Sequence, residues 1–115
     1  MHEVSLALNI LEIAQKQCKE SGHTIIASIT LDIGRGAGVM KDALLFAFDA
    51  VKQGSLADKA ELIINDVLFS GHCHSCHKDF TSEQEYVLFC PLCSSFEIEI
   101  HRGREMNIVE MEVND

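Results

Sequence analysis

The sequence predicts an α/β fold of the α+β type, in which a small mixed sheet with two helices carries an inserted cysteine-rich domain. Three observations predict it. Apolar residues recur every three or four positions in two stretches, they alternate with polar residues in others, and four cysteines fall in two CxxC pairs within one segment. We expect residues 1–69 and 105–115 to form one domain and residues 70–104 the inserted one.

The first element is predicted to be a helix over residues 4–19. Its apolar residues form one stripe, which includes Cys18 as a small core residue. Glu3 stands at the positive N-terminal end of this helix, and Gly22 ends it. This pattern places His2 at the helix entry.

A strand, a helix and a second strand follow. Residues 24–33 alternate, which predicts a half-buried strand with the odd-numbered residues from Ile25 to Ile33 facing the core. Residues 39–53 return to helical spacing, and residues 59–69 indicate another strand. This order is typical of a right-handed crossover unit.

Two further stretches complete the first domain. GRGAG at residues 34–38 lacks the Gly-Lys-Ser/Thr that a phosphate-binding loop requires, so it predicts a flexible connection. REMNIVEMEV alternates again, with Val109, Met111 and Val113 on one face. We expect this last strand to return to the sheet of the first domain.

The charge limits the partners. The formal net charge is −9, which repels nucleic acid and anionic lipid and attracts cations and basic protein surfaces. No signal-peptide pattern and no apolar run of membrane-spanning length occurs. We therefore expect a cytoplasmic protein with no nucleic-acid or membrane partner, whose cysteines are thiols or metal ligands.

The CxxC pairs CHSC and CPLC are separated by thirteen residues. Each pair forms a tight turn that points two thiolates inward, and two facing turns provide the closed tetrahedral site that structural zinc occupies. With all four positions filled, zinc would fold this zinc-ribbon-like domain rather than catalyse a reaction. The predicted ligands are Cys73, Cys76, Cys90 and Cys93.

Three histidines, His72, His74 and His77, surround the first pair. The sequence leaves three roles open for them. An imidazole can replace a thiolate on the metal, it can charge on acidification and loosen the site, or it can be a solvated loop residue.

His2 has a specific chemistry when a free amino terminus precedes it. The terminal amine of Met1, the backbone nitrogen of His2 and its imidazole close adjoining chelate rings in one plane. Three nitrogens in a plane suit Ni(II) or Cu(II) and not zinc, which prefers a tetrahedron. Because the amine and imidazole must lose protons, metal affinity should fall as the pH drops.

In this order, the motifs resemble the HypA/HybF family of hydrogenase nickel-incorporation proteins. MHE, LDIG, AFD, the two CxxC pairs and REMNIVEMEV match the family's pattern over essentially the whole chain. The resemblance implies a nickel metallochaperone and not an enzyme. It would help to insert Ni(II) into [NiFe] hydrogenase during maturation, with a HypB-type GTPase and the hydrogenase large subunit as partners.

The resemblance also implies the sites. Nickel binding carries to Met1, His2 and Glu3, and zinc binding to the four cysteines. Some relatives have an acidic residue near the start of the second helix, where this chain has Met40, with Asp42 two residues on. Asp42 is therefore one candidate for a fourth nickel ligand. The sequence leaves open a monomer or a homodimer, and its alternative function is a zinc-ribbon interaction adaptor without a nickel site.

Overall fold

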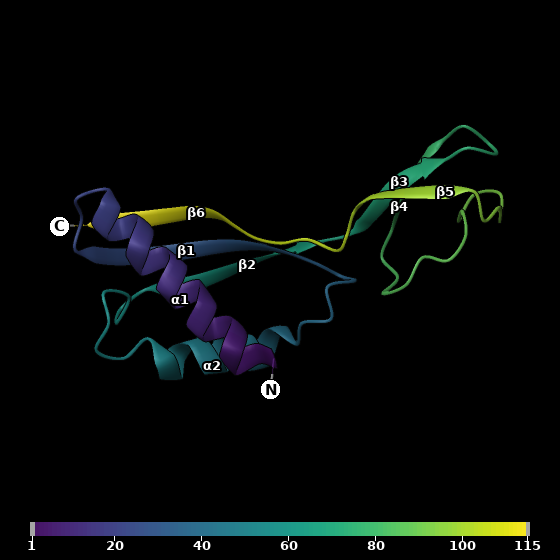
Figure 1. The fold of residues 1–115 in the computed structure, drawn as a ribbon. Helices are drawn as coiled ribbons and strands as arrows, with labels where there is room; N and C mark the ends of the chain where they lie inside the picture. The colour runs from purple at the N-terminus through teal and green to yellow at the C-terminus, as the bar shows by residue number, and fades with distance from the viewer. Residues whose placement is uncertain (1, 115) are drawn as a thin grey trace. The chain divides into compact units, whose positions relative to one another are not determined.

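The computed structural model describes residues 2–114, so Met1 and Asp115 lie outside the described residues. Two three-stranded sheets form, one in the order β2-β1-β6 and the other in the order β4-β3-β5 (Figure 1). The predicted α+β fold is confirmed. The elements in chain order are α1 (His2–Glu20), β1 (Ile25–Gly34), α2 (Lys41–Val51), β2 (Glu61–Val67), β3 (Phe69–Cys73), β4 (Asp79–Ser82), β5 (Ile98–Arg102) and β6 (Met106–Asn114).

The chain packs as two compact units. The first comprises Met1–Leu31, Val39–Ile64 and Ile108–Asp115, and it contains both helices. The second comprises Asp32–Gly38 and Asn65–Asn107, and it contains the sheet β4-β3-β5. The two units are defined by their internal packing. The predicted division into a nickel-binding domain and an inserted zinc-binding domain at residues 70–104 stays a prediction.

Helix α1 forms as the periodicity predicts and packs against α2. Its last turn closes on Gly22, which has a positive φ of 80°, while the backbone N–H of His23 donates to the carbonyl oxygen of Cys18 at 3.0 Å. Among residues 2–114, no helix has the length and apolar character needed to span a bilayer. The buried stripe consists of Ala7, Ile10, Leu11, Ala14 and Cys18, which confirms Cys18 as a core residue.

Strand β1 is the centre of the first sheet, and β2 runs in the same direction while β6 runs in the opposite one (Figure 1). The predicted half-buried pattern is wrong for β1. Ser28 and Thr30 are buried as well as Ile29, Leu31 and Ile33, whereas Ile25 is 44% exposed. A central strand is covered by side chains of both neighbouring strands, and the Ser28 hydroxyl donates to Glu112 of β6 at 2.9 Å.

Strand β6 forms at the edge of the same sheet. The prediction that this last strand returns to the sheet of the first domain is confirmed, although Val109 on its apolar side is 50% exposed. A groove of about 300 Å³ lies between α1 and β6 and keeps this face partly open to solvent. The groove is lined by Ile13, Ala14, Gln17, Ile108, Val109, Glu110 and Met111.

The glycines of GRGAG pack closely against two other stretches of the second unit. A Cβ atom on Gly34 would lie 2.1 Å from the carbonyl oxygen of Gly103, and one on Gly36 would lie 2.2 Å from the ring of Phe69. The backbone N–H of Gly36 also donates to the Gly103 carbonyl at 2.7 Å. Close packing therefore requires these glycines, whereas the sequence predicted only a flexible connection.

Glu105 closes the turn between β5 and β6. Its Oε1 accepts a hydrogen bond from the backbone N–H of Gly103 at 2.6 Å, and its Oε2 accepts one from Arg102 Nε at 3.0 Å. Burial raises the pKa of this carboxyl, but its own backbone N–H, that of Gly103 and the Arg102 guanidinium lower it further. The net pKa therefore lies below the ordinary value of 4.5.

We expect Glu105→Gln to lower the free energy of unfolding by about 1 kcal/mol at pH 7, because charged hydrogen bonds in the turn are lost. The folded-state pKa lies below that of the unfolded chain. The carboxylate's contribution is thus complete above the unfolded pKa and is lost as the pH falls through the folded pKa. Urea unfolding of both proteins should show that the difference in their free energies of unfolding shrinks as the pH falls through this range. Glu110→Gln on exposed β6 is the control, and a pH-independent difference would contradict the assignment.

Candidate metal centres

The two CxxC pairs fold into turns of the same geometry. In the first, the backbone N–H of His77 donates to the carbonyl oxygen of Cys73 at 2.9 Å. In the second, the backbone N–H of Ser94 donates to the carbonyl oxygen of Cys90 at 2.8 Å. His77 and Ser94 both have positive φ angles, 61° and 68°, which is uncommon for residues other than glycine. His77 thus closes the first turn by its backbone conformation.

Backbone N–H groups inside these turns point at sulfur. The N–H of Cys76 donates to Cys73 Sγ at 3.5 Å, and the N–H of Leu92 donates to Cys90 Sγ at 3.4 Å. Each turn thus directs a backbone N–H at the sulfur of its first cysteine.

The four sulfur atoms lie within 4.8 Å of one another. The Cys73 and Cys93 sulfurs are 3.6 Å apart, and those of Cys76 and Cys90 are 3.8 Å apart. In a regular tetrahedron with zinc–sulfur bonds of about 2.3 Å, the edges measure about 3.8 Å. The four predicted cysteines thus come together in a geometry that fits zinc.

The charges of the four groups also favour a cation. The hydrogen bond from the Cys76 backbone lowers the pKa of the Cys73 thiol to about 6. For Cys93, the backbone N–H of Ser95 lowers the pKa, but partial desolvation and contacts with the other three sulfurs raise it further, to about 11. The two thiols thus differ in how readily they lose a proton, and a bound cation would favour the deprotonated form of both.

This cluster indicates a structural zinc site. The described cysteines are free thiols, and Cys73 and Cys90 are buried while Cys93 is exposed. Four thiolates would fill the tetrahedral shell of zinc and leave no position for a substrate. Zinc bound there would fix the two turns to each other and thereby order the second unit.

The predicted nickel residues lie at the start of α1, in the first unit. His2 is exposed and is the first residue of the helix. The first N–H groups of an α-helix have no partner within the helix, so the backbone nitrogens of His2 and Glu3 are not committed to helical hydrogen bonds. The terminal amine belongs to Met1, which lies outside the described residues.

The Glu3 side chain has a structural contact. It is only 7% exposed, and its Oε2 accepts a hydrogen bond from the backbone N–H of Met40 at 3.1 Å. Met40 precedes α2 and has no side-chain cap of its own. The carboxylate therefore ties the first turn of α1 to the start of α2, where Asp42 lies exposed in the first turn.

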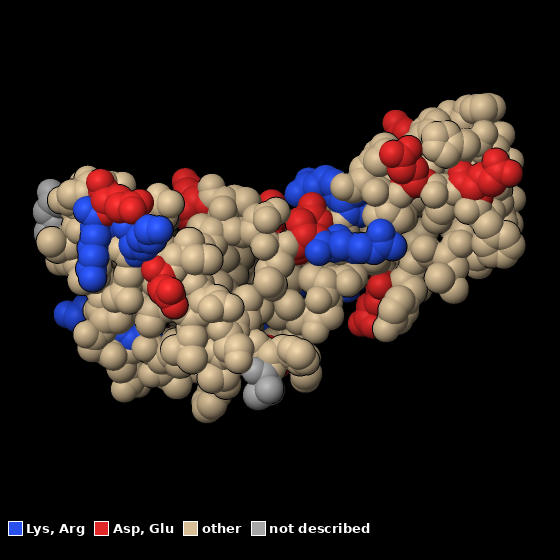
Figure 2. All heavy atoms as spheres, viewed as in Figure 1, with Lys and Arg blue, Asp and Glu red and all other residues tan. Residues whose placement is uncertain are grey.

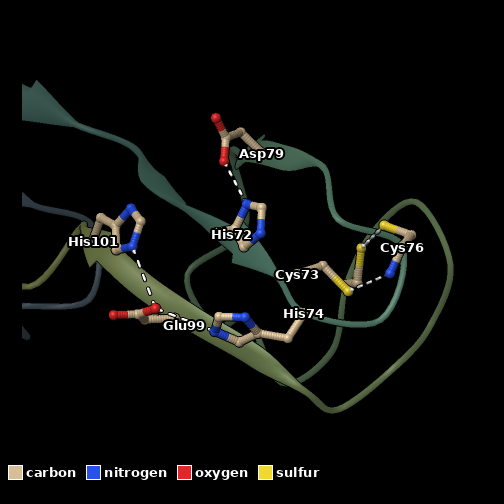
Figure 3. A network of polar contacts seen from close by, with 8 residues as sticks. His72, Cys73, His74, Cys76, Asp79, Glu99 and His101 are labelled. Atoms are coloured by element: carbon tan, nitrogen blue, oxygen red, sulfur yellow. Dashed lines mark hydrogen bonds and ion pairs between the residues drawn. The ribbon is translucent and has the colours of Figure 1, made fainter.

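Two of the three histidines around the first CxxC pair contact carboxylates, and the sequence predicted neither contact (Figure 3). His72 Nδ1 is 2.8 Å from Asp79 Oδ1, and His74 Nε2 is 3.2 Å from Glu99 Oε1. In E-I-H, the spacing by two residues predicts that Glu99 and His101 share one face of β5. His74 follows the last residue of β3, so no spacing rule predicts its contact.

The comparisons with known proteins agree with this geometry. Residues 1–113 match the family model described as hydrogenase/urease nickel incorporation, metallochaperone, hypA. The chain belongs to the HypA family. The predicted family resemblance is therefore confirmed, and so are its nickel-metallochaperone function in hydrogenase maturation and its non-catalytic character.

Relatives and solved structures of the family cover almost the whole chain. A hydrogenase maturation factor HypA from Psychromonas ingrahamii is 39% identical over 100% of both chains. One from Rhizobium leguminosarum bv. viciae is 36% identical over 98% of this chain and 99% of its own.

Two solution structures share the fold of the HypA family. That of the Ni metallochaperone HypA from Helicobacter pylori has a TM-score of 0.69 at 24% identity, covering 98% of this chain and 97% of that one. Another HypA protein has a TM-score of 0.72 at 25% identity, covering 99% and 97%.

We expect removal of zinc to unfold the sheet β4-β3-β5 while α1 and α2 stay folded. Structural zinc contributes about 10–16 kcal/mol of binding free energy, and a cysteine-rich unit with few apolar residues depends on it. Amide hydrogen exchange before and after chelation should show loss of protection in residues 70–104 and retention in the helices. Restoring zinc is the control for reversibility. Unchanged protection of the sheet without metal would contradict a structural zinc site.

Proposed function

We propose that this chain binds Ni(II) at its amino terminus and passes it to [NiFe] hydrogenase during maturation. The observation that carries the proposal is that α1 begins at an exposed His2, next to a buried and hydrogen-bonded Glu3. The proposed ligands are the Met1 amine, the backbone nitrogen of His2 and the His2 imidazole. In this proposal the backbone nitrogen of Glu3 and the carboxylate of Asp42 are further candidate ligands.

The helix start supplies what a planar nickel site needs. A backbone nitrogen binds Ni(II) only after it loses its proton, and it cannot do so while it donates a helical hydrogen bond. In the first turn that donation is absent. Chelate rings that share this nitrogen hold the donors in one plane, which suits Ni(II) and disfavours zinc.

Glu3 acts in this proposal as a positioning residue. Its hydrogen bond to the Met40 N–H at 3.1 Å anchors the first turn of α1, so the residue beside His2 is fixed. His2, which carries the proposed imidazole ligand, is exposed. An exposed site built on a chain terminus permits rapid exchange, which suits a carrier that hands an ion to another protein.

We propose a HypB-type GTPase and the hydrogenase large subunit as the partners in this transfer. The net charge of −9 favours a partner with basic surfaces. Asp and Glu side chains are interspersed with Lys and Arg over the face in Figure 2, separated by wide uncharged stretches. Since the zinc thiolates require reducing conditions, we place this function in the cytoplasm.

We expect His2→Ala to lower the affinity for Ni(II) by at least about tenfold, because the imidazole donor is lost. A few additional residues before Met1 should have the same effect, because they convert the terminal amine into an amide. Calorimetric titration of the zinc-loaded proteins, combined with backbone amide NMR, measures the affinity and locates the nickel. His77→Asn is the matched control, because asparagine tolerates a positive φ.

Full affinity in either altered protein, with amide signals of α1 still perturbed by nickel, would contradict the amino-terminal site. A native chain that holds one zinc and binds no nickel would instead support the zinc-only adaptor.

We expect Glu3→Ala to weaken nickel binding and to lower the free energy of unfolding by about 1–3 kcal/mol, because the Met40 N–H loses its acceptor. Glu3→Gln retains an acceptor oxygen and should keep most of both properties. Thermal unfolding and nickel titration of the two variants test this. Equal nickel affinity in Glu3→Ala and the native chain would exclude the positioning role.

A further inference from the structure

The connection between β4 and β5 carries a concentration of exposed apolar side chains. It spans residues 83–97 and extends away from the sheet β4-β3-β5 (Figure 1). Its large apolar residues are exposed by 48% to 78%. We define the apolar patch as Tyr86, Leu88, Phe89, Leu92 and Phe96. Soluble proteins seldom leave several such side chains together in water unless the surface is used for binding.

The second CxxC turn brings the two ends of the apolar patch together. The backbone N–H of Cys90 donates to the carbonyl oxygen of Ser95 at 2.8 Å, so the residues that flank the turn lie side by side. The rings of Phe89 and Phe96 meet edge-on, with their centroids 6.3 Å apart. Leu92 lies within the turn, where its backbone N–H donates to Cys90 Sγ at 3.4 Å. The fold that gathers the cysteines therefore also holds the patch.

The exposure of the patch is not forced by the lack of a core. Phe69 and Phe80 belong to the same unit, and they are only 3% and 6% exposed. The unit thus buries aromatic rings against its sheet and leaves others outside. Aromatic side chains have few rotatable bonds and lose little conformational entropy on binding, and they are enriched among the residues that dominate the affinity of protein interfaces.

Carboxylates border the patch. Residues 83–99 contain four glutamates and no lysine, arginine or histidine. Arg35 reaches the backbone carbonyl of Glu83, but its charge is paired with Asp66 at 2.9 Å. Three of the glutamates are next to the patch in the sequence and are exposed, namely Glu83, Glu85 and Glu97. The surface therefore has an apolar centre and an acidic border.

This charge discriminates between the occupants that could cover the patch. A second copy of the chain would bring its own acidic border against this one, and an anionic membrane would be repelled in the same way. A protein segment that combines apolar side chains with lysine or arginine would cover the centre and neutralise the border. Charge complementarity therefore favours a basic protein partner.

We propose that the apolar patch binds a basic, apolar segment of a partner protein, such as the exposed face of an amphipathic helix. The aromatic and leucine side chains supply the buried contacts, and the glutamates orient the partner and accelerate its association. The proposal depends on no nickel ligand. A chain with His2→Ala should therefore bind the partner as the native chain does, whatever its affinity for nickel.

The experiment uses the full zinc-loaded chain and, as the probe, an amphipathic helical peptide of leucine and lysine. Calorimetric titration should show one peptide bound per chain, and the amide NMR signals of residues 86–96 should shift. The double substitution Leu88→Ser and Phe96→Ser should weaken this binding by at least about tenfold. Phe46→Ser is the matched control, because Phe46 is 79% exposed on α2, outside the patch, and its loss should leave the affinity unchanged.

The acidic border has a test of its own. The double substitution Glu85→Gln and Glu97→Gln should lower the affinity by at least about threefold and make it less dependent on salt concentration. A peptide of leucine and glutamate should bind the native chain at least about tenfold more weakly than the lysine peptide does.

Five results would overturn the proposal. They are no binding of the lysine peptide, equal affinity in the Leu88→Ser and Phe96→Ser variant and the Phe46→Ser control, NMR shifts confined to residues outside 83–99, dimerisation through the patch in sedimentation, and tighter binding to vesicles of phosphatidylcholine and phosphatidylserine than to the peptide. Zinc content and circular dichroism check that the double variant folds, and Tyr86→Ser provides an independent variant with a smaller expected loss.

Discussion

Four thiolates within 4.8 Å of one another would repel strongly, and a zinc ion at their centre would offset that repulsion. Much of the second unit depends on it. Bound zinc would join the two CxxC turns, and the sheet β4-β3-β5 extends directly from the first of them. The histidine and carboxylate groups on that sheet keep their places only while its strands stay paired.

The chain separates a closed metal site from an open one by choosing different donors. Sulfur ligands drawn from two tight turns surround zinc completely and belong to the folded structure. The nitrogen ligands proposed for nickel come from adjacent residues at a helix start. They would therefore leave the ion open to solvent. This difference explains how one small protein can retain one ion and release another.

Much of the architecture was predictable because it depends on local periodicity. The stripe on α1 and the CxxC spacing are properties of neighbouring residues, and both predicted their structures. The burial of Ser28 and the exposure of Val109 were not predictable, since they depend on which strands lie beside them. The contact of Glu3 with Met40 joins residues 37 positions apart, so no spacing rule reveals it.

The close packing of Gly34 and Gly36 against Gly103 and Phe69 bears on how this protein can be dissected. A peptide excised at residues 70–104 would retain all four zinc ligands. It would lack Phe69 and the GRGAG segment, including the hydrogen bond from Gly36 to Gly103. Such a fragment would still bind metal, but the ends of its strands nearest Gly103 would lose their packing partners. Its backbone would therefore be less rigid than that of the same residues in the intact chain.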